Sequence, residues 1–562
     1  MIKSRRFPNV LLLFVSLLFF QAPLFATIGR KAMVATAHPI ATEAAVQVLQ
    51  EGGNAVDAAL AAQWMLNVVE PQSSGIGGGG FFLFYEAATK RIYAFDGREQ
   101  APQEAFPEMF LDKNKVPYPF IERATGGLPV GVPGTLRLLK QVHNRFGSKR
   151  FSFSELFDPA IQIAEEGFLV SPRLAGFIDQ QKDRLARFEA SHNIFFNGKG
   201  EPRKTRELLI QPDLAQTFRL IQQEGVDVFY EGKLAQEIVE AVRRAPFHPG
   251  LMKKEDLFYY QAIERLPLQG TYRGYDIFSI GPPSSGGTTL IEALNILENF
   301  DLKSMRRSAD FIHVFSEAQK LAFQNRNRYL GDPKFTQIPL ENLLSKELAK
   351  VSFQTIQMNA TLPTLQNLQG LEGTTTSHIS IADENGNIVS YTTTIEHIFG
   401  SAMVVPGRGF LLNNELTDFD EIPKDKEGKL KANAPQPEKR PRSSMTPTLV
   451  FKKGRPVLIV GSPGGSTIIA TVLNVVTNVI DFKMPLEEAL SAARILNRDG
   501  PLELETEIFA NAMIKQKLRE KGNEIIYKEN FGNAQAILFD ESQNDILVGA
   551  SDPRSEGRAA GY

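Results

Sequence analysis

Hydrophobic residues recur along this chain at two spacings, one typical of helices and one typical of strands. Apolar positions at helical spacing predict helices over residues 41–49, 55–69, 135–146, 214–223, 233–245, 290–297, 312–329, 467–480, 485–493 and 507–521. Asn54 is a favourable N-cap for the second of these helices. β-Branched and aromatic runs predict strands over residues 32–37, 81–85, 448–451 and 456–460, another from residue 91, and a closing hairpin. This alternation fits several mixed folds.

Residues 373–394 form the stretch around which the other predictions are organised. A run of hydroxyl residues leads into an alternating segment, then Asn385-Gly386, then a second β-branched segment, a pattern that predicts a hairpin with a tight turn. Thr376 begins that hairpin. A threonine hydroxyl is a poor nucleophile without a base, but a cut before Thr376 would supply one, an α-amino group with a pKa of roughly 7.7 to 8.0. A plain surface hairpin explains the same residues.

A glycine-rich segment follows the second predicted helix. Gly75, Gly77 and Gly80 satisfy the G-x-G-x-x-G count of dinucleotide-binding proteins. That motif needs a strand before it and a helix after it, whereas here the predicted helix comes first and the predicted strand follows. We therefore interpret the segment as a turn that lets backbone pack closely before a buried strand.

Two polar segments suggest binding sites for charged groups. Arg98 lies just past a predicted strand end on a glycine-containing turn, where its guanidinium is suited to grip a carboxylate. Glu415 and Asp418 are three residues apart and share one face if the segment is tightly turned, which suits an ammonium group. A surface arginine and a charged loop explain these residues equally well.

Three loops with serine or glycine have both a functional and a structural interpretation. Ser443 and Ser444 lie in a basic loop, and residues 281–288 precede a helix where they form either an anion nest or a tightly packed turn. Gly464 and Gly465 follow a predicted strand, and consecutive backbone N–H groups there suit a developing oxyanion. A simple turn is the alternative for that pair.

Composition excludes several classes of protein. The chain has 562 residues, of which 43% are hydrophobic and 22% charged, and its formal net charge is -2, so no charge excess indicates nucleic acid. It has no cysteine, and its seven histidines form none of the closely spaced pairs that bind metals. Neither a cysteine nucleophile nor a metal enzyme is expected.

The N-terminus resembles an export signal. A basic end precedes an apolar run over residues 10–20, which is too short to span a bilayer at roughly 20 residues. This pattern predicts a signal peptide over residues 1–26, with an uncleaved anchor as the alternative. We expect a bacterial protein that is periplasmic or secreted.

Thr376-Ser377-His378, followed eighteen residues later by Thr394, resembles the processing site of the γ-glutamyltranspeptidases, an N-terminal-nucleophile hydrolase family. Other family-like segments lie at residues 96–102, 125–134, 413–419, 439–448, 461–466, 550–554 and 560–562. The resemblance implies that the chain cuts itself between Thr375 and Thr376. Thr376 then becomes the catalytic nucleophile, and Thr394 orients its hydroxyl.

The resemblance also assigns roles to the polar segments. It implies that Arg98, Ser443 and Ser444 hold the substrate α-carboxylate, that Glu396, Glu415 and Asp418 hold the ammonium group, and that Gly464 and Gly465 stabilise the oxyanion. Many members have asparagine where this chain has Glu396, which adds a third acid. Residues 420–438 lack the tyrosine that closes over the pocket in some relatives, so we expect a more open site.

The fold implied by the resemblance is α+β, a four-layer αββα sandwich. A large subunit of residues 27–375 and a small subunit of residues 376–562 would form one intertwined domain, a heterodimer of the chain's own fragments. The implied activity is that of a γ-glutamyltransferase and glutathione hydrolase, which passes the acyl group to water, amino acids or peptides and needs no cofactor. The alternatives are a related acylase acting on cephalosporin side chains or poly-γ-glutamate, and an unprocessed exported binding protein.

Overall fold

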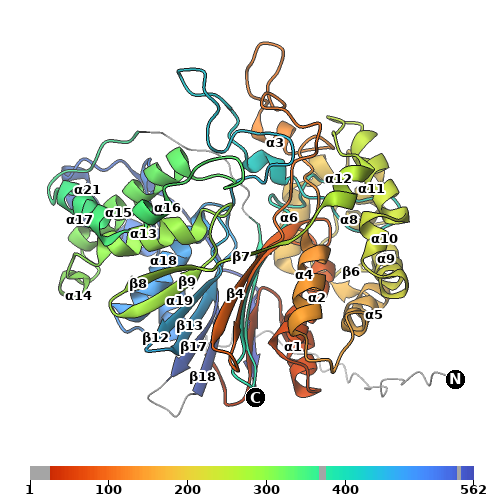
Figure 1. The fold of residues 1–562 in the computed structure, drawn as a ribbon, viewed down its shortest axis with the longest axis horizontal. Coiled ribbons are helices and arrows are strands. Elements are labelled where there is room, and N and C mark those ends of the chain that lie inside the picture. The colour runs from red at the N-terminus through yellow and green to blue at the C-terminus, as the bar shows by residue number, and fades with distance from the viewer. Residues whose placement is uncertain (1–25, 366–374, 541–545) are drawn as a thin grey trace.

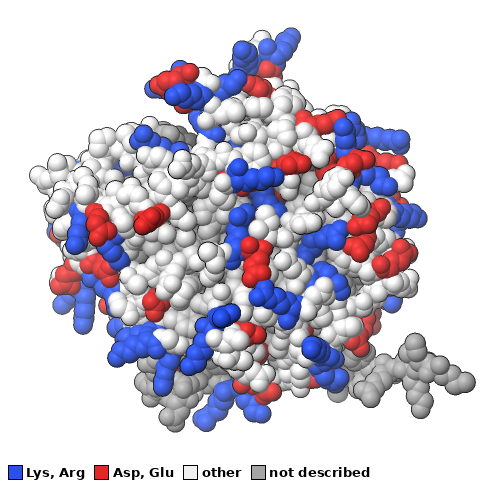
Figure 2. Space-filling view, in the orientation of Figure 1, with Lys and Arg blue, Asp and Glu red and all other residues white. Residues whose placement is uncertain are grey.

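The computed structural model describes residues 26–365, 375–540 and 546–562. The predicted signal peptide therefore lies outside the described residues, apart from Ala26. Among the described helices, none is long and apolar enough to cross a membrane. Basic and acidic side chains are interspersed on the face shown in Figure 2, as expected from the small net charge.

Two antiparallel sheets of seven strands each stack at the centre of the molecule (Figure 1). The first sheet has the order β1 (Thr27–Gly29), β18 (Ile546–Ser551), β17 (Gln535–Asp540), β13 (Arg455–Gly461), β12 (Thr448–Lys452), β9 (Tyr275–Ser279) and β8 (Leu268–Tyr272). The second has the order β19 (Arg558–Gly561), β2 (Met33–Thr36), β10 (Ser377–Ala382), β11 (Ile388–Thr394), β3 (Gly79–Glu86), β4 (Arg91–Asp96) and β7 (Ile263–Arg265).

Helices cover the outer face of each sheet. The second sheet packs against α1 (Pro39–Gln50), α2 (Ala55–Val69) and α4 (Thr135–Phe146), with α5 (Asp158–Glu166), α9 (Pro212–Glu224) and α11 (Lys233–Arg243) outside them. The first sheet packs against α13 (Gly286–Leu297), α18 (Thr467–Ile480) and α19 (Leu486–Ser491), with α15 (Ala309–Tyr329) beyond. The predicted four-layer αββα sandwich is confirmed.

Burial on both faces explains the apolar runs of the central strands. In β3, Phe81, Leu83 and Tyr85 belong to the core between the sheets, whereas Phe82 and Phe84 face the helices. Every residue of β10 and β11 is buried. A strand that is covered on both sides has no solvent-facing positions, so β3 lacks the polar alternation of a half-exposed strand.

Local signals predicted several helices with their bounds. The helices predicted over residues 55–69, 135–146 and 467–480 are α2, α4 and α18. Asn54 caps α2 in a reciprocal capping box, in which its side chain accepts from the backbone of Asp57 and the Asp57 carboxylate accepts from the backbone of Asn54.

Other boundaries differ from the predictions. Residues 507–521 form two helices, α20 (Thr506–Ala510) and α21 (Ala512–Glu520), because Asn511 is extended and its side chain caps the second. Helix α17 (Lys346–Thr355) has no counterpart among the predicted helices.

The hairpin of β10 and β11 is confirmed. Its loop spans residues 383–387, and within that loop Gly386 alone has a positive φ, of 81°. A two-residue type I′ turn would require a positive φ at Asn385 as well. The wider loop is stabilised by the carboxylate of Asp383, which accepts from the N–H groups of Asn385 and Asn387.

Candidate active site

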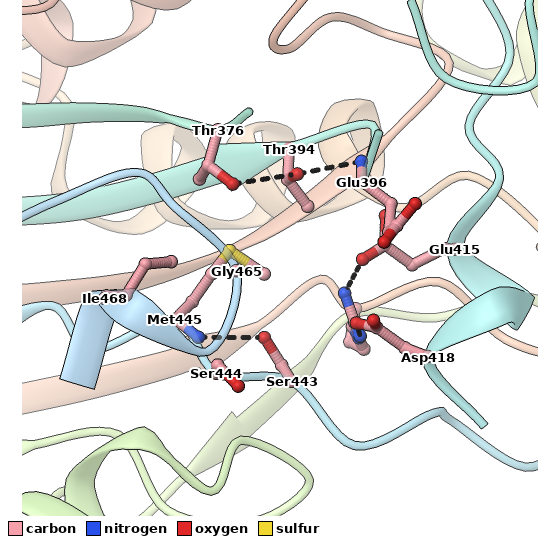
Figure 3. Close-up of a pocket in the computed structure, with 11 residues that line it drawn as sticks. Thr376, Thr394, Glu396, Glu415, Asp418, Ser443, Ser444, Met445, Gly465 and Ile468 are labelled. Carbon is pink, nitrogen blue, oxygen red and sulfur yellow. Dashed lines mark hydrogen bonds and ion pairs between the residues drawn. The ribbon is translucent and has the colours of Figure 1, made fainter. Parts of the chain in front are cut away.

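Thr376 and Thr394 face each other because of the register of the β10–β11 hairpin. Ser377 pairs with Thr393, so Thr376, just before β10, lies opposite Thr394, the last residue of β11. The same end of β11 pairs with β3, where Thr394 is opposite Gly79. Figure 3 shows both threonines at the edge of one cavity.

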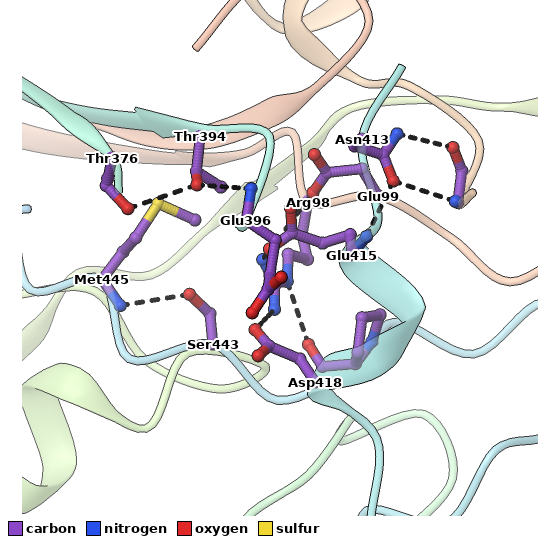
Figure 4. Close-up of polar contacts among 12 residues, drawn as sticks. Arg98, Glu99, Thr376, Thr394, Glu396, Asn413, Glu415, Asp418, Ser443 and Met445 are labelled. Carbon is purple, nitrogen blue, oxygen red and sulfur yellow. Dashed lines mark hydrogen bonds and ion pairs between the residues drawn. The ribbon is translucent and has the colours of Figure 1, made fainter. Parts of the chain in front are cut away.

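The hydroxyl of Thr376 lies at the peptide bond that precedes it. Thr376 Oγ1 donates to the carbonyl oxygen of Thr375 at 2.6 Å and lies 3.2 Å from Thr394 Oγ1. Thr394 Oγ1 accepts from the N–H of Glu396 at 2.9 Å (Figure 4). It also donates to the same Thr375 carbonyl at 3.3 Å. Two hydroxyl groups and a carbonyl are therefore within hydrogen-bond reach of one another.

The glycine segment after α2 makes this close packing possible. A Cβ atom on Gly78 would lie 2.0 Å from the carbonyl oxygen of Thr394, and one on Gly77 would lie 2.0 Å from the carbonyl oxygen of Leu411. No side chain fits at either distance. The interpretation of residues 75–80 as a close-packing turn, rather than a nucleotide motif, is confirmed.

Arg98 is fully buried and forms ion pairs with both acids that the sequence singled out. Its Nη1 pairs with Oε1 of Glu415, and its Nη2 lies 2.5 Å from Oδ2 of Asp418. The guanidinium also donates to the carbonyl oxygens of Pro441 and Arg442, at 3.0 and 3.3 Å. Residues that are more than 300 positions apart in the sequence thus meet in one cluster.

Glu99 is a further acid of this cluster that the sequence analysis did not identify. Its Oε2 lies 3.7 Å from Arg98 Nη1, on a side chain that is completely buried (Figure 4). Burial, and then the neighbouring Glu415, raise the pKa of Glu99 well above its ordinary value. Burial and the neighbouring Glu415 therefore favour the protonated form of Glu99.

Burial and neighbouring charges also shift the pKa values of Glu415 and Arg98. Burial raises the pKa of Glu415 to about 7, although the charge of Arg98 acts in the opposite direction. Burial alone would lower the pKa of Arg98, but Glu415 and Asp418 outweigh it and raise that pKa. The guanidinium stays charged, while Glu415 changes its charge near neutral pH.

Glu396 approaches the same cavity from the end of β11. Its carboxylate accepts from the side-chain amide of Asn414, and only 4% of the residue is exposed. Glu396, Glu415 and Asp418 all line the cavity, so three carboxyl groups share it with the Arg98 guanidinium.

The paired serines lie across the cavity from the hairpin. Ser443 Oγ accepts from the N–H of Met445 at 3.1 Å, and Ser444 Oγ accepts from Arg326 Nη2 at 2.7 Å. The carbonyl of Ser443 accepts from the N–H and the hydroxyl of Ser285, at 2.8 and 2.7 Å. Their loop is therefore held from both sides.

Residues 281–288 serve to hold that loop. A Cβ atom on Gly286 would lie 2.3 Å from Thr446 Oγ1, and one on Gly287 would lie 2.4 Å from the carbonyl oxygen of Ile280. These distances support the tightly packed turn over the anion nest as the explanation of this segment.

Gly464 and Gly465 form the turn between β13 and α18, with φ of 129° and 56°. Gly465 lines the cavity that holds Thr376, whereas Gly464 lines a neighbouring cavity of about 540 Å³. Their carbonyl groups accept from the N–H groups of Thr467 and Ile468 in the first turn of α18. Their joint role as oxyanion donors stays a prediction.

The cavity collects nearly all of the predicted site residues. Its volume is about 20 Å³, room for roughly one water molecule. Its lining comprises Arg98, Thr376, Thr394, Glu396, Glu415, Asp418, Ser443, Ser444, Met445, Gly465 and Ile468. Met445 and Ile468 were not predicted, because a single apolar side chain forms no motif that indicates a site. The position of Met445 directly after the two serines was the one available signal.

The chain is similar over nearly its full length to proteins of known sequence and structure. The family described as Gamma-glutamyltranspeptidase matches residues 41–562. The "Glutathione hydrolase proenzyme" of Bacillus subtilis strain 168 is 41% identical over 556 residues, which cover 95% of this chain and 92% of that protein. The Escherichia coli K12 protein of the same name is 39% identical over 545 residues, covering 95% and 92%. The crystal structure of a cephalosporin acylase from Bacillus halodurans has a TM-score of 0.85 at 29% identity and covers 100% of this chain and 99% of that one.

Proposed function

Because the chain belongs to the gamma-glutamyltranspeptidase family, we propose that it is a glutathione hydrolase that also transfers γ-glutamyl groups. The enzyme cleaves the γ-glutamyl amide bond of glutathione and related compounds. It passes the acyl group to water or to the amine of an amino acid or peptide. The observation that best supports this proposal is the position of the Thr376 hydroxyl, which donates a hydrogen bond to the Thr375 carbonyl and lies opposite Thr394.

Self-cleavage is the first reaction of the site. Thr376 Oγ1 attacks the carbonyl carbon of Thr375, a C–O bond forms, the C–N bond breaks, and the hydroxyl proton passes to the departing nitrogen. Water then hydrolyses the resulting ester, which frees the carboxyl group of Thr375 and both the amine and the hydroxyl of Thr376. Thr394 is placed to support the developing oxyanion, because its hydroxyl donates to the Thr375 carbonyl.

The freed amine of Thr376 serves as the base in every later turnover. It takes the proton of its own hydroxyl as Oγ1 attacks the γ-glutamyl carbonyl, and it returns that proton to the leaving amine. An acyl-enzyme ester remains, which water or an acceptor amine cleaves. Gly465, with Gly464, stabilises the tetrahedral oxyanion from across the cavity.

The charges around Arg98 favour a zwitterionic donor. A γ-glutamyl group carries one carboxylate for Arg98, Ser443 and Ser444, and one ammonium group for Glu396, Glu415 and Asp418. In the uncleaved chain Arg98 pairs with Glu415 and Asp418, so donor binding exchanges internal ion pairs for pairs with the ligand. A glutaryl group has no ammonium and would leave buried carboxylates unpaired, which is costly. This argues against the acylase alternative.

The strand order of the second sheet supports the proposal that the two fragments stay associated after cleavage. Strands β10 and β11, from the fragment 376–562, lie between β2 and β3, from the fragment 27–375. The two fragments therefore share a sheet and would stay together as one intertwined heterodimer. We further propose that residues 1–26 direct export to the periplasm or the medium.

N-terminal sequencing of the smaller fragment tests the proposal. It should begin at Thr376-Ser377-His378, and a Thr376→Ala variant should stay in one piece and fail to hydrolyse γ-glutamyl-p-nitroanilide. The exposed Thr205→Ala is a matched control that should behave as wild type. Full activity of an uncut wild-type chain would refute the mechanism, and faster hydrolysis of glutaryl-p-nitroanilide would refute the donor.

A further inference from the structure

A short turn after α2, residues 70–74, lies at the open end of the β10–β11 hairpin, where β10 begins and β11 ends. The hydroxyl of Thr375 donates to the carbonyl oxygen of Gln72 at 3.1 Å, and the N–H of Phe399 donates to the same oxygen at 3.0 Å. The N–H of Ile395, the residue after β11, donates to the carbonyl oxygen of Ser73 at 3.2 Å. The turn thus holds the residue before Thr376 and the chain beyond Thr394.

Glu70, the first residue of this turn, holds the residue after Thr376. Its Oε2 accepts from the hydroxyl of Ser377 at 3.0 Å, and the hydroxyl of Ser74 donates to Ser377 Oγ at 3.3 Å. Glu70 is 2% exposed. Both neighbours of Thr376 are therefore anchored to one turn, which restricts where the Thr376 hydroxyl can point.

The surroundings of Glu70 make its charge sensitive to pH near neutrality. Arg173, in the first turn of α6 (Pro172–Gln180), has its Nη1 3.6 Å from Glu70 Oε1, Gln72 Nε2 lies 3.5 Å from the same oxygen, and Glu556 is the other charged group that faces it. Burial raises the pKa of Glu70 to about 7, Arg173 and the Ser377 hydroxyl oppose that rise, and Glu556 adds to it.

We propose that Glu70 is a positioning residue for Thr376. The ionised carboxylate of Glu70 anchors Ser377, while the carbonyl group of Gln72 anchors Thr375. The inference rests on the proposed self-cleavage and deepens it. The two anchors act at different times, because Thr375 is severed from Thr376 by the cut and Ser377 is not. The Thr375 anchor therefore affects self-cleavage alone, and Glu70 affects both self-cleavage and later turnover.

Two variants of the full chain separate these effects. Self-cleavage is followed on denaturing gels during cell-free synthesis between pH 6 and pH 8, and the fully cleaved protein is then assayed with γ-glutamyl-p-nitroanilide. Thr375→Val should slow cleavage about tenfold and leave kcat within twofold. Glu70→Gln should slow cleavage about tenfold at pH 8 and lower kcat about tenfold with KM within twofold. The exposed Glu43→Gln is the control and should match wild type.

The pH profile distinguishes positioning from mere loss of stability. As pH falls from 8 to 6, wild-type Glu70 gains a proton, so the ratio of wild-type to Glu70→Gln cleavage rates should fall towards one. A constant ratio, or a Glu70→Gln enzyme with wild-type rates throughout, would overturn the inference. If Glu70→Gln folds poorly, Ser377→Ala tests the same contact from its other side and should lower kcat about tenfold.

The cleavage assay needs no γ-glutamyl donor, so the two proposals fail separately. A wild-type chain that cuts itself but does not hydrolyse the donor would refute the proposed function and leave the anchoring intact. A wild-type chain that does both, with variants indistinguishable from it, would refute the anchoring alone.

Discussion

Replacing Gly78 by alanine tests whether backbone packing aligns the two threonines. The added Cβ would lie 2.0 Å from the carbonyl oxygen of Thr394 and 2.8 Å from the side chain of Ile395. A close carbon–oxygen contact needs roughly 3.3 Å, so the end of β11 must retreat by about 1.3 Å. The Thr376–Thr394 hydroxyl distance is 3.2 Å, so a retreat of that size takes the two hydroxyl groups out of hydrogen-bond reach of each other.

A misplacement of about 1 Å at a reacting group costs on the order of 100-fold in rate. We therefore expect Gly78→Ala to slow self-cleavage about 100-fold, measured by intact mass of the chain over time after synthesis. Gly176→Ala is the matched control, because a Cβ there meets nothing within 4 Å, and it should cut itself at the wild-type rate. A Gly78→Ala chain that cleaves as fast as wild type would show that close packing at Thr394 does not align the site.

Three further predictions concern the charged cluster. Arg98→Lys loses the forked geometry that serves a carboxylate and should raise KM for γ-glutamyl-p-nitroanilide about tenfold or more, with self-cleavage unchanged; an unaltered KM would remove Arg98 from the carboxylate site. Asp418→Asn should lower the ratio of γ-glutamyl to glutaryl hydrolysis rates about tenfold. An unchanged ratio would contradict the role of Asp418 in binding the substrate ammonium group. Because the pKa of Glu415 is raised to about 7, its carboxylate is protonated below that pH, so KM should rise as pH falls from 8 to 6. Glu415→Gln should abolish this rise in KM. A rise that persists in the variant would show that another group causes it.

Local features of the chain were predictable where their causes are local. The bounds of α2, α4 and α18 follow from apolar periodicity, and at α2 also from the capping box of Asn54. The prediction for residues 507–521 was wrong because a continuous helical period does not reveal the extended conformation of Asn511.

The candidate site was predictable mainly as separate pieces. Arg98, Glu415 and Asp418 were each identified in their own loops, where a surface location explained them equally well. Their meeting depends on the stacking of the sheets and loops, which brings together groups more than 300 residues apart. Glu70 and Glu99 were missed because a carboxylate gains its unusual pKa from burial, and distant segments supply that burial.

The sequence by itself determined the hairpin, its threonines, the periodic helices and, through resemblance, the family. Only the tertiary structure decided which hydroxyl faces which carbonyl and which acids share one guanidinium. The physical reason is that hydrogen bonding and desolvation act over a few ångströms in space, whatever the separation along the chain. The hairpin register and the close approach at Gly78 set those distances, and neither is encoded by any single motif.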